Sequence, residues 1–202
     1  EIVNSANVAC GYHAGDEDTM IKVIKGAIPL ELCKVNVINM DLLNHALNYP
    51  GDPQHPHAFG YYSPIFLESL LIHMLPKIEK ATQKTLNPAY SYGRIYFHGS
   101  ELPRHTDRPS SEWAVTCCLE KHKEWPISFD KDGEVTTIDL DVGDICIYKG
   151  IEYPHWREVL DGPRHVQAML MYVDTNGPYV EYTLDKRPHL CHSEPCPSDS
   201  HN

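Results

Sequence analysis

The chain has 202 residues, with 17 Lys or Arg against 28 Asp or Glu, and its formal net charge is −11. This length suits one domain, or one domain with a small appendage. The acidic balance argues against nucleic acid as the main partner, because phosphate binding needs a basic surface. No run of roughly 18 uncharged apolar residues occurs, so no membrane span is expected. The sequence has no CxxC pair among its 7 cysteines and no recognisable secretory signal, which favours reduced thiols in a cytoplasmic protein.

Residues 1–27 differ in character from the rest of the chain. They contain SANVACGYHAGD, which resembles a signature of the bacterial 5-oxoprolinase A-subunit family. Nothing after Ala27 continues that family's domain, so we expect an N-terminal appendage of uncertain origin, in which His13 and Asp16 serve no active site. Asp16 is a helix-capping residue type, and a short helix is expected over residues 16–26.

Two helices separated by a loop are expected next. Residues 35–48 have a helical pattern, and residues 65–84 repeat apolar side chains at helical spacing, with a kink expected at Pro76. Residues 49–64 are rich in Pro and Gly and are expected to form an irregular loop. Such a loop is either a lid over an active site or a plain surface connection.

From Tyr90 onward the pattern is typical of short strands. Apolar residues alternate, and turn signals such as Asp132-Gly133 recur every 8–12 residues or so, as in all-β sandwiches and barrels. The fold class expected is mainly β with flanking helices. The strands are expected over these ranges: 90–98, 112–119, 135–142, 145–148 and 165–173.

The C-terminal residues 189–202 are polar and rich in proline, and we expect a flexible tail there. One catalytic domain is then expected over residues 28–188. The tail also offers a zinc site as a minor alternative, although its spacing fits no standard pattern. The residues of that alternative are His189, Cys191, His192 and Cys196.

The residues that suggest chemistry are His105, Asp107 and His155. His105 and Asp107 are two residues apart, so in an extended strand their side chains point to the same side. With His155 they make two histidines and one carboxylate, the facial triad that leaves three positions open on a non-haem Fe(II) ion. The His-x-Asp pair alone is weak support, because a chain with 13 histidines produces such pairs by chance.

Residues 88–175 resemble the Fe(II)/2-oxoglutarate dioxygenases of the prolyl-hydroxylase type. The resemblance rests on short motifs in the same order and strand context: Tyr96-Phe97-His98-Gly99, His105-Thr106-Asp107, Gly143-Asp144, His155-Trp156-Arg157-Glu158 and Gly162-Pro163-Arg164. It implies a double-stranded β-helix, also called a jelly roll or cupin-like fold, with His105, Asp107 and His155 as iron ligands. It further implies that Arg164 binds the C5 carboxylate of 2-oxoglutarate, and that Tyr96 lines the same pocket. His98, His122 and His165 are expected to be incidental.

The resemblance implies an oxidoreductase that uses Fe(II), 2-oxoglutarate and O2, with ascorbate as a supporting reductant. It would hydroxylate an unactivated C–H bond of an amino acid, a peptidyl residue or a small metabolite, while 2-oxoglutarate is decarboxylated to succinate and CO2. Related halogenases replace the carboxylate ligand with a small residue, so Asp107 favours hydroxylation. Two alternatives remain: a non-catalytic cupin-like binding module and, from residues 1–27, a 5-oxoprolinase component. The sequence leaves the substrate and the oligomeric state open.

Overall fold

The computed structural model of the chain describes residues 21–47, 55 and 57–191. Within these residues, two antiparallel sheets are accompanied by two long helices, α1 (Leu30–Leu47) and α2 (Ile65–Thr82). Two short 3-10 helices span Pro109–Ser111 and Val180–Lys186. The strands are β1 (Lys22–Ile24), β2 (Ala58–Tyr62), β3 (Leu86–Phe97), β4 (Leu102–His105), β5 (Trp113–Lys121), β6 (Ile127–Lys131), β7 (Glu134–Ile138), β8 (Ile145–Tyr148), β9 (His155–Arg157) and β10 (Arg164–Asp174).

The larger sheet has six strands in the order β1-β8-β5-β10-β3-β2. Its central strand, β10, is hydrogen-bonded to β5 on one side and to β3 on the other. Most of β10 is buried, and its run from Val166 to Val173 is largely apolar, as expected for a strand covered on both faces. The alternating side chains of β10 therefore belong to two different cores.

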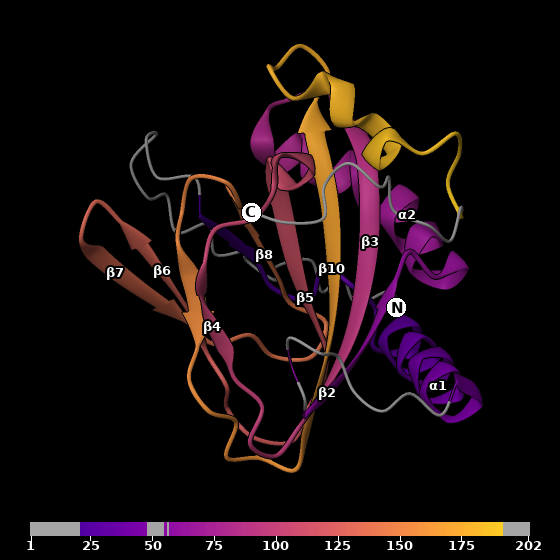
Figure 1. Cartoon of the computed structure of the whole chain (residues 1–202), viewed down its shortest axis with the longest axis vertical. Helices are drawn as coiled ribbons and strands as arrows, with labels where there is room; N and C mark the ends of the chain where they lie inside the picture. Colours follow the sequence, from indigo (N-terminus) through magenta and orange to yellow (C-terminus); the bar gives the residue numbers. More distant parts are fainter. Residues whose placement is uncertain (1–20, 48–54, 56, 192–202) are drawn as a thin grey trace, which may run out of the picture.

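The outer face of this sheet is covered by α1 and α2, whereas the smaller sheet lies on the other side (Figure 1). Leu67, Leu71 and Met74 of α2 are fully buried in one apolar cluster together with Leu170 and Tyr172 of β10. Burial of each such side chain stabilises the fold by about 1.5–3 kcal/mol relative to leaving it exposed. The helices therefore cover the outer face of the large sheet, and its inner face packs against the smaller sheet.

The smaller sheet has four strands in the order β4-β9-β6-β7. β6 and β7 form a hairpin around the turn that the Asp132-Gly133 pair predicted, with Lys131 paired to Glu134. Asp132 and Gly133 both have positive φ, 53° and 91°, as a two-residue type I′ turn requires. Phe129 of β6 and Tyr148 of β8 belong to the apolar cluster between the two sheets, so the sheets pack face to face as in a jelly roll.

Two expectations about local structure are wrong. Residues 22–24 form β1, not part of a helix, because the segment pairs with β8 at the edge of the large sheet, with Val23 opposite Cys146; residues 16–20 lie outside the described residues. Residues 58–62 form β2, not irregular loop, because they pair with β3 from Ala58 to Tyr62. Hydrogen bonding to a neighbouring strand therefore determines the conformation of both short segments.

The two long helices are confirmed, with α1 beginning five residues earlier than expected and α2 containing Pro76.

The described cysteines are free thiols, four of them buried and Cys191 exposed. Arg187, close to the tail, is buried and ion-paired with Glu68 of α2 at 2.6 Å. Among the described residues, no helix has the length and apolar character needed to cross a membrane.

Candidate metal centre

His105, Asp107 and His155 come together where strands β4 and β9 of the smaller sheet pair. One potential ligand atom from each side chain lies within 4.8 Å of the others. Nε2 of His105 is 3.5 Å from Oδ1 of Asp107, and Nε2 of His155 is 3.7 Å from the same oxygen. The two imidazole rings are 4.3 Å apart between centroids. Among the described residues this is the one group of three such side chains with metal-binding spacing.

Strand pairing explains this convergence. His105 ends β4 and His155 begins β9, and the two residues are direct partners in the antiparallel ladder. The register between β4 and β9 shifts between Leu102 and His105, a bulge of the kind that re-aims side chains beside active sites. Asp107 is then fixed by its backbone N–H, which donates to the carbonyl of Gly150 at 2.9 Å.

Gly150 leaves room for the Asp107 carboxylate. A Cβ at position 150 would be 2.3 Å from Oδ2 of Asp107 and 2.6 Å from the carbonyl oxygen of Ser111. Both distances are far inside van der Waals contact, so only a residue without a side chain fits here without displacement.

Backbone carbonyls orient both histidines. Nδ1 of His105 lies 2.8 Å from the carbonyl oxygen of Pro103, and Nδ1 of His155 lies 3.0 Å from that of Tyr153. A carbonyl accepts a hydrogen bond only, so in the neutral ring Nδ1 carries the proton and Nε2 keeps its lone pair. This is how metal-binding histidines are held in proteins, and in both rings Nε2 is the atom that faces Asp107.

The electrostatic settings of the two rings differ. Burial lowers the pKa of His155, and this outweighs the nearby Asp107 carboxylate. Burial also lowers the pKa of His105, but hydrogen bonds to Asp107 and to the Pro103 carbonyl outweigh it, so this pKa is raised. The side chain of His155 is 3% exposed and that of His105 39% exposed. The site is therefore closed on the β9 side and open to solvent on the β4 side.

The donor set fits a divalent cation such as Fe(II). Oδ2 of Asp107 is buried and has no hydrogen-bond partner, although such an atom normally has one. Two neutral imidazole nitrogens and one carboxylate are the ligands of the facial triad, which leaves open positions for other ligands. Phe129 and Tyr148 close the floor of the site, with ring centroids 6.0 and 4.9 Å from that of His155.

Arg164 does not reach this triad. Its guanidinium is ion-paired with Asp41 of α1 at 2.7 Å and with Glu120 of β5 at 2.9 Å, on the helix-covered face of the large sheet. Side chains alternate along a strand, so His165, the next residue of β10, points to the inner face. The resemblance implied that Arg164 lies at the site, whereas in the structure its side chain lies on the helix-covered face and it is His165 that lies on the inner face.

Tyr96 does face the space between the sheets. It pairs with His165 across β3 and β10, is buried, and packs edge-to-face against Trp125 with 4.7 Å between ring centroids. His98 and His122, which were expected to be incidental, are exposed. His165 is instead buried in the polar interior.

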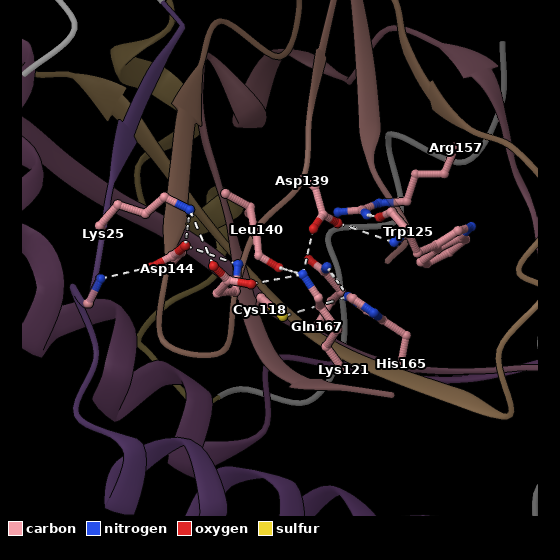
Figure 2. A network of polar contacts seen from close by, with 12 residues as sticks. Lys25, Cys118, Lys121, Trp125, Asp139, Leu140, Asp144, Arg157, His165 and Gln167 are labelled. Atoms are coloured by element: carbon pink, nitrogen blue, oxygen red, sulfur yellow. Dashed lines mark hydrogen bonds and ion pairs between the residues drawn. The ribbon is translucent and has the colours of Figure 1, made fainter. Parts of the chain in front are cut away.

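Arg157, which belongs to the His155-Trp156-Arg157-Glu158 motif but had no role assigned from the sequence, is an interior residue. It is two residues beyond His155 on β9, so the two side chains share the inner face. Its guanidinium lies 4.8 Å from the centre of the Trp125 ring and donates a hydrogen bond to the Trp125 backbone carbonyl. Figure 2 shows Arg157, Trp125 and His165 together at one end of a network of polar contacts. The sequence signal for Arg157 is strand alternation, because the residue two positions after a ligand on a strand has its side chain on the same face.

Comparison with solved structures identifies the fold. A nickel, 2-oxoglutarate and hygromycin B complex of HygX from Streptomyces hygroscopicus superimposes with a TM-score of 0.63, at 12% identity over 78% of this chain and 84% of that one. A prolyl-4-hydroxylase from Pseudomonas putida gives 0.61, at 12% identity over 78% and 94%. SnoN, a non-heme alpha ketoglutarate dependent epimerase from nogalamycin biosynthesis, gives 0.63, at 12% identity over 89% and 86%. The fold is therefore the double-stranded β-helix that these neighbours have, as the sequence predicted.

The N-terminal resemblance also has a counterpart. The model of the LamB/YcsF family matches residues 1–33, a segment that ends well before the triad. No match is found among curated protein sequences. The neighbours thus define the fold, and the activity has to be argued from the site.

Proposed function

We propose that this protein is an Fe(II)/2-oxoglutarate-dependent oxygenase in which His105, Asp107 and His155 hold the iron. The observation that carries the proposal is the convergence of these three side chains within a fold of the double-stranded β-helix type. The structural neighbours with this fold include proteins crystallised with iron, nickel or 2-oxoglutarate. An intact set of ligands argues against a module that has kept the fold and lost its metal.

The bound iron and keto acid would supply the oxidising chemistry, coupling reduction of O2 to decarboxylation of 2-oxoglutarate to succinate and CO2. The side chains of this protein do the positioning. The Pro103 and Tyr153 carbonyls hold both imidazoles with Nε2 directed inward. Phe129 and Tyr148 exclude water from the side of His155. The open side at His105 is the route by which a substrate would approach.

Hydroxylation is the outcome we propose, because the carboxylate of Asp107 is present among the ligands. The neighbours of this fold include a prolyl hydroxylase, an epimerase and a carbocyclase, so the fold by itself does not choose between these outcomes. For the primary substrate we propose a small molecule or a peptidyl residue. Tyr96 is proposed to line the pocket of the keto acid, since it is buried on the same inner face.

Succinate release tests the proposal without knowledge of the substrate. Full-length protein is incubated with Fe(II), 2-oxoglutarate, ascorbate and O2, alone and with pools of amino acids and peptides. We expect slow succinate formation without substrate and faster formation with the right pool. Asp107→Gly should abolish both, whereas His122→Ala, at an exposed histidine that pairs with Glu120, should change neither. Absence of both metal binding and succinate in the wild type would favour a non-catalytic module.

A further inference from the structure

Arg157 is a buried cation that lacks an acidic partner. The residue is 5% exposed, and no carboxylate of the described residues forms an ion pair with it. Its Nη2 is buried and makes no hydrogen bond within that part of the chain. The other buried arginine of the described residues is paired, Arg187 with Glu68 at 2.6 Å, and the half-buried Arg108 makes two hydrogen bonds of 2.7 Å to Asp185. Burying an unpaired cation destabilises the folded protein unless a bound anion pairs with it.

A second unpartnered donor lies beside it. Nδ1 of His165 is buried and makes no hydrogen bond to the described residues. Its Nε2 is 2.7 Å from the side-chain nitrogen of Gln167, whose oxygen accepts from Thr116. With the amide oriented in this way, Nε2 accepts and Nδ1 must carry the proton. Burial lowers the pKa of His165 to about 2, so the ring is a neutral donor at ordinary pH.

The two donors lie beside the same indole ring. The His165 ring lies 5.3 Å from the Trp125 ring centroid, on which the Arg157 guanidinium also rests at 4.8 Å. Figure 2 shows these three side chains close together. Two residues along a strand span roughly 7 Å, so the backbone of Arg157 stands about that far from the backbone of His155. This separation suits a short molecule that has an acid group at each end and binds the metal with one of them.

We propose that Arg157, with the Nδ1–H of His165 beside it, binds the carboxylate of the keto acid that lies farther from the metal. The proposal rests on the oxygenase function proposed above and replaces Arg164, whose side chain faces α1. The guanidinium of Arg157 and the neutral imidazole of His165 can both donate hydrogen bonds to a carboxylate. Such bonds are charge-assisted, and the site is shielded from water. Tyr96 and Trp125 form the walls of this subsite.

The test compares two keto acids of equal chain length on Ni(II)-loaded, full-length protein by calorimetry without turnover. 2-Oxoglutarate has the distal carboxylate and 2-oxovalerate lacks it. Wild type should bind 2-oxoglutarate at least about 30-fold more tightly, as expected when a buried charged partner is lost. Arg157→Gln should remove most of this preference while 2-oxovalerate affinity stays within about threefold. Arg157→Lys should restore part of the preference, and the matched control Arg164→Gln should retain all of it.

The opposite pattern, with the preference lost in Arg164→Gln and kept in Arg157→Gln, would overturn the proposal. Ni(II) affinity is measured first for every variant, so failure of the metal site is distinguished from failure of the subsite. If Arg157→Gln does not fold, the unmodified protein decides the question: a crystal structure with Ni(II) and 2-oxoglutarate should place the distal carboxylate within hydrogen-bond distance of Arg157. A carboxylate bound elsewhere would refute the assignment.

Discussion

Replacing Gly150 with alanine should damage the metal centre without touching a ligand. The new Cβ would be 2.3 Å from Oδ2 of Asp107, 2.6 Å from the Ser111 carbonyl oxygen and 3.1 Å from Cβ of Asp107, whereas ordinary contact begins at 3.4 Å. The carboxylate or the backbone must therefore move by about 1 Å. Overpacking of this kind costs about 1–3 kcal/mol of stability. A displaced ligand should also weaken metal binding by about 10–100-fold, by analogy with the loss of groups that orient ligands.

Calorimetric titration with Co(II) and unfolding in urea measure these two effects separately. The matched control is Gly133→Ala in the β6–β7 turn, where φ is +91° and nothing lies within 4 Å of the added Cβ. That variant should lose stability through backbone strain of about 1 kcal/mol or more and keep wild-type Co(II) affinity. Wild-type Co(II) affinity in Gly150→Ala would show that Asp107 is not a ligand, or that the loop moves away freely.

Three further predictions concern stability and the metal. Arg187→Met leaves the Glu68 carboxylate buried without its cation and should destabilise the fold by about 3–5 kcal/mol. The double variant Arg187→Met with Glu68→Leu should lose much less stability. If urea unfolding gives the same loss for the single and the double variant, the pair is not coupled. Phe129→Ala removes a fully buried ring beside His155 and should cost about 3–5 kcal/mol and weaken Co(II) binding; unchanged Co(II) affinity would argue against its role in the floor of the site. Co(II) at about 100 times its Kd should raise the unfolding free energy by about 2.7 kcal/mol, EDTA should reverse this, and persistence of the effect in His155→Ala would contradict binding at the triad.

The sequence was informative where a pattern has one physical cause. Alternation of apolar residues predicted the later strands, and Asp132-Gly133 predicted a turn whose two positive φ angles allow few other residues. It was uninformative for β1 and β2, because short strands at sheet edges are decided by the neighbour with which they pair. Residues 58–62 contain Gly60 and two tyrosines, a composition that fits a loop and an edge strand equally well.

For the site, too, the sequence predicted some residues and could not place others. The triad residues were proposed from ligand type, spacing and resemblance, and the structure brings them together because β4 and β9 pair at His105 and His155. The choice between Arg164 and His165 depends on which face of β10 each residue occupies, and adjacent residues in a strand always differ in this respect. The face is set by packing against α1, which lies far away in the sequence. Arg157 was accessible from the sequence, since the residue two positions after a strand ligand shares its face.

The most direct test of the account is the location of iron in crystals grown and loaded with Fe(II) without oxygen. An anomalous difference map collected at the iron absorption edge should show one strong peak in contact with Nε2 of His105, Nε2 of His155 and a carboxylate oxygen of Asp107. A map without a peak between these three side chains, or with its strongest peak elsewhere on the chain, would contradict the proposed iron centre and the oxygenase function built on it.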